Sequence, residues 1–145
     1  MLKGILLSIE GMLSMIEVYT DGAAKGDPGP SGAGIYIKNG RDYHSLSIPL
    51  GNMSNHEAEF HAVIHALDYC RQHYPDEIIS VRSDSKLVVQ SVEKSFCKQE
   101  RFRPLLQQVE TLGAQFPYFF IKWIPEKQNK QADELSRAAL QKPKG

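Results

Sequence analysis

Four acidic residues stand where a sheet and its helices could bring their carboxylates together. Asp21 and Asp84 each follow a stretch rich in β-branched or aromatic residues, so both are predicted to stand at the end of a strand. Glu59 and Asp133 fall in the opening turns of two predicted helices. In α/β proteins the carboxyl ends of parallel strands share one edge of the sheet, and ligands bind there. The spacing therefore predicts one acidic site.

Four carboxylates at one edge would repel one another unless cations neutralise them. Their hard oxygen atoms favour Mg²⁺ or Mn²⁺ over zinc. Two such ions about 4 Å apart can activate a water molecule and stabilise the leaving oxygen of a phosphodiester. Taken singly, three of these acids also have ordinary explanations: Asp21 as a turn residue, Asp84 as a helix N-cap and Glu59 as a partner of a helix dipole.

The cysteine and histidine residues do not suggest a competing metal site. Cys70 and Cys97 lack metal-ligand spacing, and we expect free structural thiols in a reducing compartment. The pair His56-Glu57 does not begin an H-E-x-x-H motif, because the residue that should be the second histidine is Phe. His61 and His65 are expected on the surface of the same helix.

Length and composition indicate a single domain. The chain has 145 residues, of which 41% are hydrophobic, and its formal net charge is zero. Residues 1–70 carry four Lys/Arg against eight Asp/Glu, whereas residues 71–145 carry thirteen against nine. Such a division is expected if one region holds metal ions and another contacts phosphates. No segment approaches membrane-spanning length, so we expect a cytoplasmic protein without a membrane partner.

Hydrophobic periodicity and turn residues predict a mixed α/β sheet that opens with three antiparallel strands and continues with parallel ones. The glycine-rich run at 29–34 lacks the Gly-Lys-Ser/Thr of a phosphate loop and is interpreted as a turn. Asn129 is the expected N-cap of the last helix. Strands are predicted at residues 15–20, 34–38, 43–49, 78–83 and 118–124, the last buried on both faces, and helices at 55–73, 86–92, 104–113 and from 130 onwards.

A basic segment follows the second predicted helix. Residues 94–103 contain four cations, Lys94, Lys98, Arg101 and Arg103, interleaved with two aromatic residues. This composition suits contact with a nucleic-acid backbone combined with base stacking. A solvated junction between two helices explains it equally well.

Five motifs in chain order resemble the signatures of type 1 ribonuclease H. They span roughly residues 15–141. The resemblance implies a ribonuclease-H-like five-stranded mixed sheet flanked by helices, and endonucleolytic hydrolysis of the RNA strand of an RNA/DNA hybrid that leaves 5′-phosphate products. The motifs are Tyr19-Thr20-Asp21-Gly22 with Gly26-Asp27-Pro28-Gly29-Pro30, Asn55-His56-Glu57-Ala58-Glu59-Phe60, Ser83-Asp84-Ser85, Trp123-Ile124-Pro125, and Asn129-Lys130-Gln131-Ala132-Asp133-Glu134-Leu135.

The resemblance also assigns roles to individual residues. Asp21 would bridge two metal ions, Asp133 would help to hold the ion that activates water, and Glu59 and Asp84 would complete the second site. Glu59 would also lie near a 2′-hydroxyl group, by which a protein distinguishes RNA from DNA. Further substrate contacts are implied for Gly22, Asp27, Asn55, His56, Lys86 and Asn129. The basic segment at 94–103 is a candidate binding surface for the hybrid.

Three departures from the family pattern affect the expected activity. The loop before Asp133 has no histidine, and general acid–base assistance is typically worth about 10²–10⁴-fold, so slower turnover is expected unless Glu126 substitutes. The long basic handle of some relatives is missing. Asp27 stands where relatives have a contact Asn, so we expect weak hybrid binding with a steep salt dependence.

The residues leave two other function classes open. A weakly active or inactive nucleic-acid-binding module on the same fold would keep the carboxylates, and a related two-metal exonuclease or junction resolvase would share the fold. We expect residues 1–14 to be an N-terminal extension, 15–141 the ribonuclease-H-like domain and 142–145 a tail. No protein partner is implied, and a monomer is expected.

Overall fold

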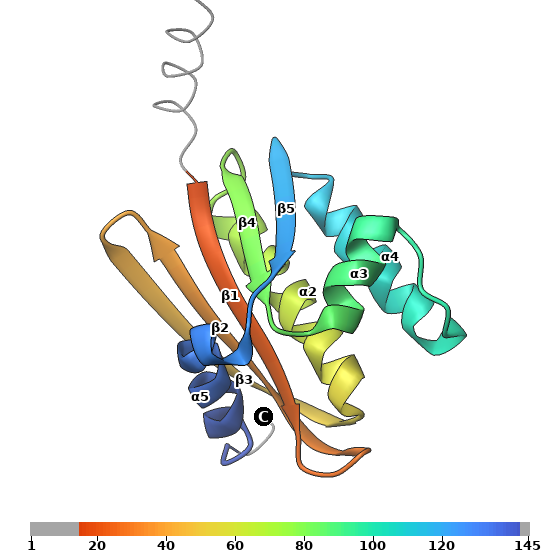
Figure 1. Ribbon diagram of the computed structural model, residues 1–145. Coiled ribbons are helices and arrows are strands. Elements are labelled where there is room, and N and C mark those ends of the chain that lie inside the picture. The colour runs from red at the N-terminus through yellow and green to blue at the C-terminus, as the bar shows by residue number, and fades with distance from the viewer. Residues whose placement is uncertain (1–14, 143–145) are drawn as a thin grey trace, which may run out of the picture.

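The computed structural model describes residues 15–142, which form one five-stranded sheet with helices on both faces (Figure 1). The strands lie in the order β3-β2-β1-β4-β5. The strands are β1 (Met15–Ala24), β2 (Gly29–Asn39), β3 (Asp42–Met53), β4 (Ile78–Ser83) and β5 (Tyr118–Trp123). The helices are α2 (Asn55–His73), α3 (Lys86–Lys94), α4 (Arg103–Gly113) and α5 (Lys130–Ala139), with short 3₁₀ turns η1 (Glu100–Phe102) and η2 (Glu126–Gln128).

The pairing of the strands confirms the predicted mixed sheet. β1, β2 and β3 form an antiparallel meander, and β4 and β5 are added parallel to β1. Consecutive strands that run parallel need a long crossover. α2 connects β3 to β4, which lie on opposite sides of the β1–β2 pair, and α3 with α4 connects β4 to its neighbour β5. As a result, β1 lies at the centre of the sheet with a partner on each side.

The two faces of the sheet are covered unequally. The hydrophobic core lies between the sheet and α2, α3 and α4, where Phe60 and Phe102 stack with ring centroids 5.5 Å apart. On the opposite face α5 packs against β1, β2 and β3. The free thiols of Cys70 and Cys97 are both buried on the core side, as expected for structural cysteines.

The predicted bounds of three strands were wrong. β3, predicted to end at residue 49, continues to Met53. β1 does not end at Asp21 but continues to Ala24, because β2 still pairs with it after β4 has ended. The run at 29–34, predicted as a turn, is instead the first half of β2. Its glycines serve close packing: a Cβ on Gly34 would collide with the carbonyl of Ala132, and one on Gly32 would press against the backbone of Ser136.

β5 is not buried on both faces, contrary to the sequence-based prediction. Phe119 and Ile121 pack against the core, whereas Tyr118 and Phe120 point the other way and are more than half exposed. The strand lies at the edge of the sheet, and no described helix covers its second face. A continuous apolar run cannot by itself distinguish a central strand from an edge strand.

The helix starts follow the predicted capping chemistry in one case and depart from it in two. Ser54 and Glu57 form the predicted capping box at the start of α2. The N-cap of α3 is Ser85, so Asp84 is not the N-cap of this helix. Asn129 precedes α5, but its side chain makes no capping bond, because its Nδ2 donates to the carbonyl of Thr20.

Within residues 15–142, no helix is long and apolar enough to span a membrane. The predicted N-terminal extension at 1–14 lies outside the described residues, as does most of the predicted tail.

Candidate active site

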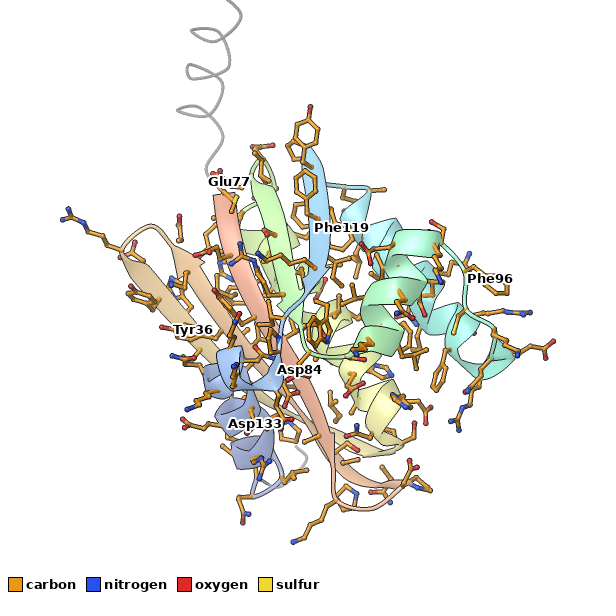
Figure 2. All side chains as sticks on the ribbon, viewed as in Figure 1. Tyr36, Glu77, Asp84, Phe96, Phe119 and Asp133 are labelled. Carbon is orange, nitrogen blue, oxygen red and sulfur yellow. The ribbon has the colours of Figure 1, made fainter. Side chains whose placement is uncertain are left out.

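All four predicted carboxylates line one cavity of about 660 Å³ at the edge of the sheet where β4 ends. Figure 2 shows Asp84 just after β4 and Asp133 on α5, on the same side of the molecule. Asp21 comes from β1 and Glu59 from α2, so four different elements each supply one acid. The remaining lining residues are Gly22, Ala23, Ala24, Lys25, Asn55, Glu126, Arg137, Leu140 and Gln141.

Asp21 is the most strongly perturbed of these acids. Burial, together with the negative charges of Asp84, Asp133 and Glu59, raises the pKa of Asp21 to about 7. A hydrogen bond that the Ser136 hydroxyl donates to Asp21 Oδ2 at 2.7 Å partly offsets this rise. The same bond fixes the orientation of the carboxylate between β1 and α5.

Asp84 is held by the residues that follow β5. Its Oδ2 accepts a hydrogen bond at 3.3 Å from Asn129 Nδ2, which also donates to the carbonyl of Thr20 at 2.9 Å. The indole Nε1 of Trp123 donates to the Asp84 carbonyl at 3.1 Å. Burial raises the pKa of Asp84, the Asn129 bond opposes the rise, and nearby acids including Glu126 add to it.

Glu59 owes its position to a glycine on β1. A Cβ on Gly22 would collide with the backbone of Ala58 and Glu59, so glycine allows the start of α2 to approach the sheet. The Glu59 side chain is only 13% exposed. It accepts hydrogen bonds from Asn55 Nδ2 at 3.2 Å and pairs with His56 Nδ1 at 3.3 Å.

Asp133 forms an ion pair with Arg137 on the same helix. Arg137 Nε donates to Asp133 Oδ1 at 3.1 Å across one turn of α5, and Arg137 lines the cavity as well. The cavity therefore contains one guanidinium group beside its acids, in a place that no sequence motif indicated.

The donor set fits hard divalent cations. Every acid that lines the cavity is a carboxylate, and none of the cysteines and histidines of the described chain lines it. Within residues 15–142, however, no group of three or more Asp, Glu, His or Cys side chains is close enough together to hold a metal ion. The carboxylates thus share the cavity without converging on a single point.

Sequence and structure comparisons place the chain in a family. The family described as Reverse transcriptase-like matches residues 19–139. EbsB of Enterococcus faecalis, which is named as a candidate hydrolase, is 44% identical over 129 residues, covering 88% of this chain and 96% of EbsB. A ribonuclease H of Salmonella arizonae is 28% identical over 147 residues, covering 91% of this chain and 93% of that enzyme.

Solved structures agree with the sequence relatives. The crystal structure of RNase H1 from Halobacterium salinarum superposes with a TM-score of 0.82 at 28% identity, covering 88% of this chain and 98% of that one. LC11-RNase H1, solved in complex with an RNA/DNA hybrid, gives a TM-score of 0.80 at 29% identity over 87% and 96% of the two chains. The chain belongs to the type 1 ribonuclease H family. Ribonucleases H work in general with divalent metal ions.

The residues expected to contact substrate in a ribonuclease H are spread over a wider surface than the carboxylates. Gly22 and Asn55 line the cavity, and His56 lies beside it through its contact with Glu59. Lys86 stands farther along, with its Nζ 5.2 Å from the centroid of the Trp123 ring. Asp27 is exposed in the turn between β1 and β2 and does not line the cavity.

The basic segment of this ribonuclease H is ordered against the start of α2. Phe102 is buried beside His56, with ring centroids 6.0 Å apart. Arg103 donates to the carbonyl of Cys97 at 3.0 Å and to that of Lys98 at 3.4 Å, so its guanidinium group is occupied in holding the loop. Lys94 and Lys98 are exposed and line a small cavity of about 210 Å³.

Sequence reasoning missed several residues that shape the ribonuclease H site. Ser136 and Arg137 lie three and four residues after Asp133, one helical turn away, and this spacing could have identified both. Gly32 and Gly34 were assigned to a turn, although together with Ala132 and Ala139 they allow α5 to approach the sheet. Nothing in the sequence indicated Lys25, which lines the cavity from the end of β1.

Proposed function

We propose that this chain hydrolyses the RNA strand of RNA/DNA hybrids endonucleolytically, with two divalent metal ions, and leaves 5′-phosphate ends. The observation that carries the proposal is the convergence of Asp21, Glu59, Asp84 and Asp133, each from a different element, on one cavity. Family membership and the relatives named ribonuclease H support the same reaction. The hybrid-bound relative LC11-RNase H1 supports the choice of substrate.

Electrostatic repulsion among the acids supports a divalent cofactor. A carboxylate whose pKa lies near 7 is poorly stabilised as an anion, and cations beside it would remove the penalty. In the proposal Asp21 would help to hold both ions, Asp133 would help to hold one of them, and Glu59 and Asp84 would help to hold the other. Mg²⁺ or Mn²⁺ bound there would supply Lewis-acid activation of water and charge stabilisation at the leaving oxygen.

The chain's own residues would orient the carboxylates before substrate arrives. Ser136 directs one oxygen of Asp21, and Asn129 directs one oxygen of Asp84, while both partners are almost fully buried. Such supporting hydrogen bonds limit the rotamers of ligating side chains. Glu59 is held by Asn55 and His56, which face the approach to the cavity, and its partly buried carboxylate is available to a 2′-hydroxyl group.

Recognition of the hybrid would depend on its backbone and groove shape rather than on base edges. Gly22, Asn55, His56 and Lys86 are proposed to contact it near the cavity. Asn129, expected from the sequence to do the same, is only 1% exposed and supports Asp84 instead. The exposed Lys94 and Lys98, with Arg101, are proposed to contact a phosphate backbone farther away, whereas Arg103 supports the loop that presents them.

The decisive experiment compares nucleic-acid substrates and one active-site substitution. Labelled RNA/DNA hybrid, duplex RNA, duplex DNA and single strands are incubated with the protein and Mn²⁺. Only the hybrid should be cut, in its RNA strand, with 5′-phosphate ends. Asp84→Asn should lower the rate by roughly a thousandfold because a charged ligand is lost.

Asp68→Asn is the matched control, since Asp68 lies on α2, pairs with Arg71 and does not line the cavity. It should cut at the rate of the unchanged protein. A hybrid that is bound but left intact would disprove the enzymatic claim. Cleavage of equal rate by Asp84→Asn would show that the metal site has been misplaced.

Glu126 is proposed to take the proton-transfer role of the absent loop histidine. It lies on η2, lines the cavity and adds to the negative field at Asp84. Glu126→Gln should lower the rate by about 10²-fold. Glu134→Gln, which changes an acid outside the cavity, should have no effect. Equal rates for the two variants would exclude the role.

A further inference from the structure

Half of one face of the sheet is left bare. α5 covers β1, β2 and β3 around Gly32 and Gly34, and no described helix lies over the start of β1 or over the same face of β4 and β5 (Figure 1). The sheet register places Tyr19 beside Arg82 and Arg82 beside Lys122. Side chains of registered neighbours point to the same face, so all three project from the bare half. We call this surface the bare face.

Aromatic side chains project from the bare face in two places. On β5 the rings of Tyr118 and Phe120 lie almost parallel with centroids 6.1 Å apart, and the two residues are 57% and 55% exposed. Farther across the sheet, Tyr36 stacks on the exposed Tyr43 with centroids 5.8 Å apart, and its ring centroid is 6.2 Å from that of Tyr19. Exposed rings of this kind are surfaces on which nucleic-acid bases stack.

Positive charge exceeds negative charge on the bare face. Among its described side chains Lys38, Arg82 and Lys122 are cationic, and only Glu17 is acidic. Arg82 pairs closely with Glu17, whereas Lys38 lies 3.9 Å from that carboxylate and 5.9 Å from the centroid of the Tyr43 ring. Lys122 is exposed and forms no ion pair within residues 15–142. Lys122 and the loosely paired Lys38 are therefore available to an anionic ligand.

This combination of rings and cations favours a single-stranded nucleic acid as the ligand. An apolar protein surface laid across β5 would remove Lys122 from water without giving it a partner, which costs free energy. A fully paired duplex keeps its bases stacked inside and would offer the rings only sugars and phosphates. A single strand presents phosphates to the cations and free base faces to the rings.

The dimensions of the bare face suit a short single strand. β3 and β5 are the two edges of the sheet, and the four strand spacings between them amount to about 19 Å. Successive nucleotides are spaced by at least about 3.4 Å along a strand, so about five of them would reach from one edge to the other. Single-strand binding domains commonly occupy about 4–16 nucleotides.

We propose that the bare face binds single-stranded nucleic acid, with bases stacked on Tyr118 and Phe120 and a phosphate group at Lys122. Lys38 and Tyr43 provide a second contact toward the opposite edge of the sheet. None of these residues lines the acidic cavity, so the site is separate from the carboxylates and does not depend on the cleavage reaction.

Two substitutions of Phe120 separate base stacking from simple apolar contact. Binding of a labelled oligonucleotide of about ten thymidines is measured in EDTA. Phe120→Leu keeps an apolar side chain but removes the ring, and it should weaken binding by about tenfold. Phe120→Tyr keeps the ring and should bind as tightly as the unchanged protein. The same oligonucleotide with photoreactive iodouracil bases should cross-link within residues 118–120.

A substitution of Lys122 tests the phosphate contact. Lys122→Gln should reduce the slope of log affinity against log salt by about 0.7, the change expected for one phosphate of a single strand. Arg71→Gln is the control, because it removes a cation from α2 on the other side of the sheet, and it should leave the slope unchanged. A blunt RNA/DNA hybrid has no free base faces, so its affinity in EDTA should be the same for the unchanged protein, Phe120→Leu and Lys122→Gln.

Four results would overturn the proposal. One is failure of the unchanged protein to bind the oligonucleotide, and another is equal affinity of Phe120→Leu and Phe120→Tyr. Cross-links confined to residues 94–103 would assign single-strand binding to the basic segment instead. A doubled mass in light scattering that Phe120→Leu abolishes, with single-strand affinity unaltered, would assign the bare face to a second copy of the chain. Equal melting temperatures verify that every variant remains folded.

Discussion

At the scale of single residues, the burial of Asp21 lowers the stability of the metal-free folded protein at neutral pH, and this loss can be measured. Its pKa is about 7 in the folded protein and near 3.8 in an unfolded chain. Below pH 3.8 the group is protonated in both states and no penalty exists. As the pH rises to 7, only the unfolded chain ionises readily, so the folded protein loses stability and remains penalised above pH 7.

Asp21→Asn should therefore stabilise the metal-free protein at pH 8 by about 2 kcal/mol, a value that allows for partial solvation of the cavity. At pH 4 the two proteins should be almost equally stable. Urea denaturation in the presence of EDTA measures both differences. A stability difference that is the same at both pH values would contradict the assigned pKa. Added Mn²⁺ should restore stability to the unchanged protein only.

Arg137 competes with cations for Asp133. Its guanidinium group occupies Asp133 Oδ1 and adds positive charge to the cavity. Arg137→Ala should tighten Mn²⁺ binding about threefold, because both effects disappear. Calorimetric titration without nucleic acid isolates this step. Arg71→Ala, which breaks a similar exposed pair with Asp68 outside the cavity, should leave Mn²⁺ binding unchanged, and so should Arg137→Ala if the pair is incidental.

At the scale of elements, the sequence predicted where the acids would stand better than how the elements pack. Strand and helix periodicity located β1, α2, β4 and α5, and with them all four acids. The glycines at 32 and 34 were misassigned because glycine favours turns, and the reason for its presence here is a helix that follows about a hundred residues later. Asn129 stands at the predicted N-cap position of α5, but the hydrogen bonds of its side chain could not be predicted, because its partners Thr20 and Asp84 are distant in sequence.

The close approach of α5 gives a prediction for Gly34. Its missing side chain leaves room for the carbonyl of Ala132 and the amide of Ser136, which flank Asp133 and the hydroxyl that binds Asp21. Gly34→Ala should destabilise the protein by about 3 kcal/mol, since backbone atoms must move. It should also weaken Mn²⁺ binding, because α5 carries Asp133.

Gly40→Ala is the control for this change. Gly40 lies in the β2–β3 turn with a φ of 62°, and no heavy atom lies within 4 Å of the place that an alanine methyl group would take. Its cost is conformational and should be about 1 kcal/mol, with Mn²⁺ affinity unchanged. Thermal denaturation and calorimetry together separate the two cases. Equal losses of stability would mean that α5 can shift at little cost.

At the scale of the whole molecule, a net charge of zero conceals two regions of opposite sign. Acids gather at the cavity, and the exposed cations Lys94 and Lys98 lie beyond the start of α2, on the segment that Phe102 anchors beside His56. The sequence did not predict this division in space: Asp84, Glu126 and Asp133, three of the five acids that line the cavity, come from residues 71–145, the half with an excess of cations. It could not predict which cations are already occupied, as Arg103 is, since that depends on the path of the loop.

This division leads to a prediction for hybrid binding. If Lys94 and Lys98 each contact a phosphate, replacing both by Ala should reduce the slope of log affinity against log salt by about 2. Binding is measured in an Asp84→Asn background so that the hybrid stays intact. The matched control replaces Lys38 and Lys122, two cations on the bare sheet face away from the cavity, and should leave the slope nearly unchanged. A slope that responds equally to both pairs would show that the hybrid senses only the total charge of the molecule, and the basic segment would then have no special part in binding.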